Sequence, residues 1–422
     1  MKFEQYSIAS SIKRSLEELG FKKPTDIQFK AIPSILKGDD VFAIAQTGTG
    51  KTAAFAIPVL HKLTYNTHRK FKKGQVQCLV MVPTRELAIQ IGDVFKKIGK
   101  YTDIDILSVI GGVDSEQQIQ KLQKGVDILI ATPGRMFDLI HQGFLDLSAL
   151  NTLILDEADL MLSLGFRKDI MDVLKHIPQK RQTLFFSATI DKDIKAIAYD
   201  IVRHAIRIQI SPKDPITKNV THYMMHMEMD DKRYFLERLI REKGDSKVLV
   251  FVRTKVRAER VAAAMDRAKI DSLIMHSGIE QKEREQILNK FKTGAVKLLI
   301  TTDLNARGVD IPNVDFVLNY DIPDEAENYV HRIGRTGRGT AKGYAYSFCA
   351  PEEVEKLKVV EDYIGFKIDV LEVSKEEYLD TIVFTEAIDD NNDWRKLLEQ
   401  AAKEEEELGL LEPKKKKGKK KK

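Results

Sequence analysis

The sequence predicts an α/β protein with two domains, each built on a mostly parallel sheet with helices on both faces. Short apolar runs alternate with amphipathic stretches along residues 1–365, which is typical of buried parallel strands joined by helices. The chain has 422 residues, too many for one ordinary domain, and 43% of them are hydrophobic. These numbers exclude a disordered chain and allow two sizeable cores.

The apolar runs also predict where the domains begin and end. Pro212 and Pro215 interrupt the pattern, so we expect a first domain at 1–208, a linker at 209–218 and a second domain at 219–365. A C-terminal extension with a basic tail is expected at 366–422. The expected strands are 41–45, 78–82, 104–110, 126–131, 152–155 and 183–186, then 248–252, 272–275, 296–300, 314–318 and 344–348.

Charge and cysteine content narrow the class of protein. The formal net charge is +5, but eight lysines lie in residues 414–422, so the rest of the chain is slightly acidic. Cys78 and Cys349 match no metal-ligand spacing and indicate a reducing compartment. No apolar run is long enough to span a membrane, and the N-terminal stretch does not resemble a secretory signal. We therefore expect a soluble, cytoplasmic protein without a membrane partner.

A phosphate-binding loop is expected at residues 45–52, AQTGTGKT, between an apolar strand and a helical pattern. Backbone N–H groups would face an anion, Lys51 would neutralise phosphate oxygens and Thr52 would bind Mg²⁺. The alternative is an ordinary glycine-rich turn. The residues expected to bind the nucleotide are Gln46, Thr47, Gly48, Thr49, Gly50, Lys51 and Thr52.

Two carboxylates follow the expected strand 152–155. In this architecture Asp156 would hold Mg²⁺, and Glu157 would orient and deprotonate an attacking water. The alternative is an acidic helix N-terminus, which the helix dipole favours. Because Gly-Lys-Thr lies upstream, the pair favours an ATP site.

Gln28 has two interpretations. With Thr25 it fits a capping box, and its amide also has the donor and the acceptor needed to recognise the adenine edge. The sequence alone slightly favours the helix-capping interpretation of Gln28 over adenine recognition.

Arginines recur every third residue in the second half, at Arg332, Arg335 and Arg338. Their planar guanidinium groups suit bidentate phosphate binding and stabilise charge that develops in phosphoryl transfer. If both sheets face one cleft, these arginines would complete an ATP site in the first domain. The alternative is a basic surface helix with no ligand.

Small residues, hydroxyl groups and single arginines recur where the expected strands end. Ligands bind at the carboxyl ends of parallel strands, and such residues suit a phosphodiester backbone. Each cluster alone also fits a turn or a helix cap. The strand-end candidates are Thr84, Arg85, Gly112, Thr132 and Arg135 in the first domain and Thr301 in the second. Gln281 and Arg284 are further candidates, three apart on one face of the helical pattern 280–291.

Together these motifs resemble those of the DEAD-box ATP-dependent RNA helicases over about residues 1–365. The resemblance implies two tandem RecA-like domains, ATP and Mg²⁺ as cofactors, and RNA, single-stranded or in short duplexes, as partner. It assigns adenine recognition to Phe3, Phe21 and Gln28 and places Asp303 near the ribose. It also implies that Ser187, Thr189 and His331 couple the state of the bound ATP to closure of the two domains. It also assigns arginine-finger roles to Arg335 and Arg338, and RNA contact to Arg253. The compact length and basic tail resemble bacterial RhlE-type members.

The expected activity is RNA-stimulated ATP hydrolysis coupled to local unwinding of short RNA duplexes. One alternative is an ATP-gated RNA clamp or assembly factor with little unwinding. Another is a DNA helicase of a related superfamily, which Asp159 and the resemblance of residues 20–28 to the family's adenine-reading Q motif disfavour. Ribosomal or RNA-decay proteins fit as partners. We expect the lysines of residues 414–422 to tether RNA without specificity; the alternatives are a solvated tail or a nuclear signal.

Overall fold

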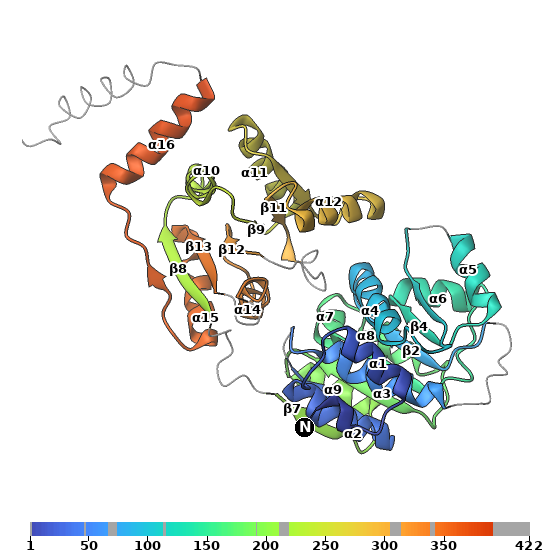
Figure 1. Cartoon of the computed structure of the whole chain (residues 1–422). Helices are drawn as coiled ribbons and strands as arrows, with labels where there is room; N and C mark the ends of the chain where they lie inside the picture. The colour runs from blue at the N-terminus through green and yellow to red at the C-terminus, as the bar shows by residue number, and fades with distance from the viewer. Residues whose placement is uncertain are drawn as a thin grey trace, which may run out of the picture.

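The computed structural model describes residues 2–45, 48–65, 74–112, 115–190, 192–210, 219–303, 314–337 and 342–390. They form two α/β units, one on each side of the expected linker (Figure 1). The linker residues 211–218 and the basic tail lie outside the described residues. Among the helices that are described, none is long and apolar enough to cross a membrane.

The first domain contains a parallel sheet with helices on both faces. Its strand order is β3 (Ile106–Val109), β4 (Ile128–Ala131), β2 (Cys78–Met81), β5 (Thr152–Leu155), β6 (Gln182–Ser187), β1 (Val41–Ile44) and β7 (Ile206–Gln209). Along β1, Val41 and Ala43 pack into one core and Phe42 and Ile44 into the other. These side chains are almost fully buried, as expected for a strand covered on both faces.

Each face of this sheet is covered by its own group of helices. One face packs against α1 (Ser10–Glu18), α2 (Asp26–Lys37), α3 (Lys51–Thr64) and α4 (Arg85–Ile98). The other packs against α5 (Ser115–Lys124), α6 (Pro133–His141), α7 (Ala158–Ser163), α8 (Arg167–Val173) and α9 (Lys192–Ile201). The 3₁₀ helix η1 (Phe3–Gln5) precedes α1.

The second domain has a parallel sheet of the same plan. Its order is β10 (Ser272–Met275), β11 (Leu298–Thr301), β9 (Val248–Phe251), β12 (Phe316–Asn319), β13 (Gly343–Cys349), β8 (Val220–His226) and β14 (Asp369–Val370). The helices α10 (Lys232–Lys243), α11 (Lys255–Arg267) and α16 (Lys375–Asp390) pack on one side of it. On the other side lie α12 (Gln281–Thr293), α14 (Ala326–Ile333) and α15 (Val354–Ile364), with η2 (Pro351–Glu353) before α15.

The predicted fold class is confirmed, because both sheets are parallel and flanked by helices. Three strands were not expected from the sequence: β7, β8 and β14. The first two are only partly buried, and β14 has two residues, so none of them stands out as an apolar run. Past residue 365, β14 pairs with β8, and Tyr378 donates a hydrogen bond to Asp231 at 2.6 Å.

The two sheets have the same strand order. When the two strand orders are compared position by position, β8 is the counterpart of β1, β9 of β2, β12 of β5 and β13 of β6. The pairing register agrees, since Leu155 pairs with Met81 and Phe185 as Asn319 pairs with Phe251 and Ser347. The carboxyl ends of these strands therefore occupy equivalent places in the two domains.

Candidate nucleotide and RNA site

The loop between β1 and α3 ends in the lysine that the sequence singled out. Gly48 and Gly50 have φ of +81° and +90°, in the left-handed region that glycine adopts without strain. Lys51 is the first residue of α3 and is 6% exposed. Its Nζ finds no hydrogen-bond partner in the part of the chain that the structure describes. A buried ammonium group without a partner suits an anionic ligand; Gln46 and Thr47 lie outside the described residues.

Two buried carboxylates follow β5 and lie near Lys51. Asp156 and Glu157 are 3% and 9% exposed, and Asp156 Oδ1 accepts a hydrogen bond from the Glu157 backbone N–H at 3.0 Å. Glu157 has φ +50°, a conformation that side chains other than glycine rarely adopt.

Burial raises the pKa of both carboxyl groups, and that of Glu157 reaches about 7. The charge of Lys51 opposes this effect, Asp156 and Asp159 add to it, and Arg335 of the second domain also opposes it. A carboxylate with a pKa near neutrality is well suited to accept a proton from water.

Asp159 links the acidic segment to the end of β6. Its Oδ2 accepts hydrogen bonds from the Ala188 backbone N–H at 3.1 Å and from Thr189 Oγ1 at 3.4 Å. Ser187 is fully buried, and its hydroxyl donates to the Thr189 carbonyl oxygen at 2.8 Å. Ser187 and Thr189 thus form one hydrogen-bonded unit with Asp159, which lies two residues from Glu157.

Gln28 takes part in helix capping and also contacts the phosphate loop. Its Oε1 accepts from the Thr25 backbone N–H at 3.0 Å, which confirms the capping interaction expected from the sequence. Its Nε2 donates to the Gly50 carbonyl oxygen at 3.1 Å. A Cβ at Gly50 would lie 2.4 Å from Nε2, so only glycine allows this approach.

The two aromatic residues near Gln28 differ in exposure. Phe3 is 4% exposed and packs in the core of the first domain. Phe21 is partly buried, and its ring lies 5.9 Å from that of Phe3, edge to face. Phe3 therefore supports Phe21, and Phe21 is the ring with a surface left for a ligand.

The arginines of the second domain do not share one environment. Arg332 is 1% exposed and donates to both carboxylate oxygens of Asp303, at 2.5 and 2.7 Å, and to the Asp321 carbonyl oxygen. Arg332 and Asp303 are therefore held together inside this domain. Arg335 is 5% exposed and follows the end of α14, which also carries the partly buried His331. Arg338 lies outside the described residues.

In the first domain, the expected RNA contacts gather at the ends of β2, β3 and β4. Thr84 caps α4 by accepting from the Leu87 backbone N–H at 3.3 Å. The exposed Arg85 lies over a glycine pair, and a Cβ at Gly112 would meet its Nη1 at 2.6 Å. Thr132 is the residue before α6.

Arg135 lies on α6 and is 9% exposed. Its Nε donates to Gln118 Oε1 at 3.5 Å, and its Nη2 has no hydrogen-bond partner in the described ranges. The guanidinium group is therefore anchored on one side and still has donor capacity for an anion. Gln118 was not predicted, because an amide on a polar helix gives no sequence signal.

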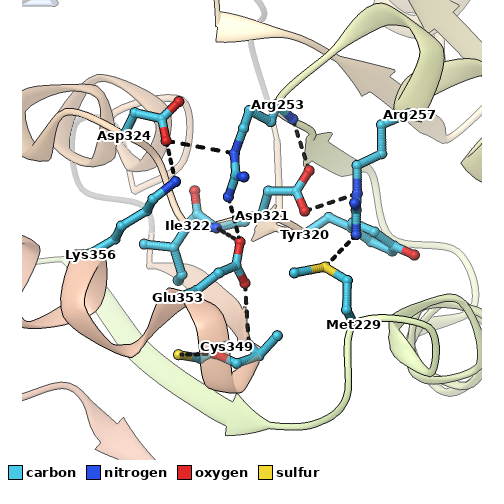
Figure 2. A network of polar contacts seen from close by, with 12 residues as sticks. Met229, Arg253, Arg257, Tyr320, Asp321, Ile322, Asp324, Cys349, Glu353 and Lys356 are labelled. Atoms are coloured by element: carbon cyan, nitrogen blue, oxygen red, sulfur yellow. Dashed lines mark hydrogen bonds and ion pairs between the residues drawn. The ribbon is translucent and has the colours of Figure 1, made fainter.

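In the second domain, the expected RNA contacts are tied into ion pairs or buried. Arg253 donates to Glu353 Oε1 at 2.8 Å, within the polar network of Figure 2. Gln281 is 4% exposed and donates to Glu285 at 3.4 Å. The hydroxyl of Thr301 is fully buried and donates to the Met275 carbonyl oxygen at 3.0 Å, so Thr301 is not part of the proposed contact surface.

Arg284 makes a contact that the sequence did not predict. Its Nη1 lies 2.5 Å from Oε1 of Glu86, on α4 of the first domain. Glu86 directly follows Arg85, which is the one signal that could have drawn attention to it.

Comparison with known proteins decides the family. The DEAD/DEAH box helicase family model matches residues 25–197, and the helicase conserved C-terminal domain matches residues 231–340. A DEAD-box ATP-dependent RNA helicase named CshA, from Geobacillus kaustophilus, is 40% identical over 359 residues, which are 85% of this chain and 76% of the relative. The chain belongs to the DEAD-box ATP-dependent RNA helicases.

Further relatives of this DEAD-box chain agree in sequence and in fold. The ATP-dependent RNA helicase RhlB of Shewanella piezotolerans is 38% identical over 384 residues, 90% of this chain and 88% of the relative. The structure of S. cerevisiae Dbp5 bound to RNA and ADP BeF3 has a TM-score of 0.79 at 28% identity, covering 92% of this chain and all of that one. Mss116 bound to ssRNA and UDP-BeF has a TM-score of 0.80 at 27% identity, covering 91% and 82%. The fold is thus a tandem RecA-like pair; the RhlE-type resemblance remains a prediction.

Proposed function

We propose that this chain hydrolyses ATP in response to RNA, binds single-stranded RNA across both domains and separates short RNA duplexes locally. The observation that carries the proposal is the environment of Glu157. This buried carboxylate has its pKa raised to about 7, and the positive charges of Lys51 and Arg335 both act to lower that pKa. One acid therefore lies within electrostatic reach of a phosphate-binding lysine in its own domain and an arginine from the other domain.

The residues present fit a nucleotide with Mg²⁺. The ammonium group of Lys51 has no hydrogen-bond partner among the residues that the structure describes, Asp156 and Glu157 are buried carboxylates, and the hydroxyl of Thr52 follows the lysine. Thr52 and Asp156 would hold the cation, which neutralises phosphate oxygens when bound. Lys51 would bind the phosphates, and Gln28 and Phe21 would hold the adenine.

In the proposed reaction, Glu157 orients the attacking water and accepts its proton. Arg335, and Arg338 by resemblance, stabilise the negative charge that develops on the transferred phosphoryl group. The hydrogen bonds from Ala188 and Thr189 to Asp159 connect this centre to the end of β6. Through Ser187, Thr189 and His331, the state of the nucleotide would influence how the domains approach each other.

RNA binding is proposed along the strand ends of both domains. The contacts would be mostly to the backbone, so little sequence preference is expected, and RNA would be distinguished from DNA by the 2′-OH. The proposed residues are Thr84, Arg85, Gly112, Thr132 and Arg135 in the first domain and Arg253, Gln281 and Arg284 in the second.

The test measures ATP hydrolysis with single-stranded RNA, with DNA of the same sequence and without nucleic acid, beside strand separation of a short RNA duplex. RNA should stimulate hydrolysis more than DNA, and strand separation should require hydrolysable ATP. Hydrolysis unchanged by RNA would contradict the proposal. Retention on RNA with a non-hydrolysable analogue, without strand separation, would favour the RNA clamp. The cytoplasmic location and the ribosomal or RNA-decay partners remain predictions.

A further inference from the structure

The second domain contains a buried polar network where the first domain has its nucleotide site (Figure 2). Because the strand orders and registers agree, Tyr320 and Asp321 follow β12 as Asp156 and Glu157 follow β5. Asp321 is 1% exposed and, like Glu157, lies two residues beyond the paired end of its strand. The network therefore occupies the same place in the sheet as the catalytic carboxylates.

Lys232 is the counterpart of Lys51. Each lysine is the first residue of the helix that follows the equivalent strand, α10 after β8 and α3 after β1. Both are buried, and Lys232 is completely so. Their partners differ: Nζ of Lys51 has none among the described residues, whereas Nζ of Lys232 donates to the Tyr320 carbonyl oxygen at 2.7 Å and to Glu353 Oε2.

Glu353 brings the carboxylate that bonds the lysine directly, while Asp321 Oδ1 lies 3.7 Å from the same Nζ. Glu353 lies in η2, just after β13, in the segment that corresponds to the residues following Ser187 at the end of β6. Its Oε1 accepts from Arg253 Nη2 at 2.8 Å and from the Ile322 backbone N–H at 3.2 Å. Its Oε2 accepts from Lys232 and from the Ala350 backbone N–H at 3.2 Å.

These four donors form the set that a phosphate group would use. A lysine, an arginine and two backbone N–H groups from the ends of different strands converge on two oxygen atoms. An ion pair alone would need only Lys232 and Glu353. Since Ile322 and Ala350 also direct their N–H groups to the same carboxylate, the second domain has an anion-binding site that the Glu353 side chain occupies.

We propose that Glu353 is a built-in anion that fills the phosphate position of the second domain's counterpart of the nucleotide site. It gives this domain permanently the charge neutralisation that Lys51 gains from a nucleotide. The chain therefore takes one nucleotide, in its first domain, and the second domain keeps its strand ends ordered when no nucleotide is bound. The inference does not depend on the proposed RNA-coupled activity.

The test removes the built-in anion and supplies inorganic phosphate. Full-length Glu353→Ala is made in a Lys51→Ala background, so that the first domain does not respond to phosphate. Thermal unfolding and hydrogen–deuterium exchange over residues 227–243 and 349–364 are followed while phosphate replaces chloride at constant ionic strength. We expect a lowered melting temperature and faster exchange, both reversed by phosphate.

The controls separate a specific anion site from a general salt effect. The Lys51→Ala parent and Glu355→Ala, which changes an exposed carboxylate nearby, should show only the general stabilisation that phosphate gives a folded protein relative to chloride. The double change Lys232→Met and Glu353→Gln removes both charges and should show no more than this general effect. If Glu353→Ala does not fold in chloride, its refolding yield is measured across the same titration. A phosphate response of Glu353→Ala no larger than that of the parent would overturn the proposal.

Discussion

Nη1 of Arg284 lies 2.5 Å from Oε1 of Glu86, so an ion pair joins α12 of the second domain to α4 of the first. Their side chains are 12% and 8% exposed. Arg284 is a proposed contact for an RNA phosphate, and Glu86 lies next to Arg85, a proposed contact in the other domain. If Arg284 binds an RNA phosphate as proposed, the Glu86 carboxylate would compete with RNA for its guanidinium group.

Replacing Glu86 with glutamine should strengthen RNA binding in the absence of ATP by about two- to fivefold, the range of a modest ion pair. The plot of log affinity against log salt should steepen by about 0.7, the value for one additional single-strand phosphate contact. Fluorescence anisotropy across a salt series measures both. Glu116→Gln, on a surface helix of the same domain, is the control. Weaker binding by Glu86→Gln would show instead that the pair holds the domains together.

Glu157→Gln should lower ATP turnover by about 10²- to 10⁴-fold, because the amide cannot accept the proton from water. Binding of ATP and RNA should persist, since glutamine has nearly the same shape. In the wild-type chain, the basic form of Glu157 exists above its pKa of about 7, so kcat/KM should fall as pH drops below that value. Steady-state hydrolysis from acid to neutral pH tests this. If kcat/KM did not fall as the pH drops below about 7, Glu157 would not be the general base.

Lys51→Met should abolish the rise in melting temperature that ATP produces, because the only described ammonium group poised for the phosphates is lost. The same change should raise the pKa of Glu157 further, since Lys51 opposes the effect of burial. Lys62→Met is a matched control on α3: its Nζ donates to Gln182 at 2.7 Å, away from the site. That control should lose some stability and keep the ATP response. An intact ATP response in Lys51→Met would contradict the site.

Gln28→Ala should raise KM for ATP more than KM for GTP. Adenine and guanine present different edges, and the amide of Gln28 offers both a donor and an acceptor. If Gln28 acts only through the Thr25 cap and the Gly50 carbonyl, the two KM values should rise by the same factor. Hydrolysis of both nucleotides at saturating RNA distinguishes the outcomes.

Deleting residues 414–422 should weaken RNA binding and flatten its salt dependence, because eight lysines are removed. The segment lies outside the described residues, so this prediction rests on charge alone. Saturating ATP turnover should not change. A deletion that abolished saturating turnover would show that the tail takes part in the catalytic cycle. Exchanging the lysines for serines keeps the length and isolates the effect of charge.

Much of the fold could be predicted because most strands are aliphatic runs buried on both faces. Strand β7 was missed, since only Ile208 of its residues is buried. Strand β8 mixes buried and exposed positions, and its sequence, VTHYMMH, contains two histidines. Strand β7 lies at the edge of its sheet and β8 has only the two-residue strand β14 on its outer side, so neither is covered enough to leave a continuous apolar pattern in the sequence.

The nucleotide site could be predicted because its residues are close together in the chain or follow a strand directly. The ion pairs could not, because their partners are distant: Glu353 is 121 positions from Lys232, and Glu86 is 198 from Arg284. In the sequence, Lys232 is simply one charge in a polar segment. Only the fold shows that it is completely buried and needs an anion.

The strand order has a consequence for how the chain folds during synthesis. Among the described strands, β1, which leads into the phosphate loop, pairs with β6 and β7 alone, and both are made after residue 181. The N-terminal segment therefore leaves the ribosome long before its neighbours in the sheet exist. Nucleotide cannot assist the early stages of folding, because the loop that would bind it has no support until the first domain is nearly complete. Strand β8 is likewise synthesised well before its neighbour in the sheet, β13. We therefore expect two stages of synthesis, one for each sheet, in which an apolar strand lacks its partners and the nascent chain is prone to aggregate.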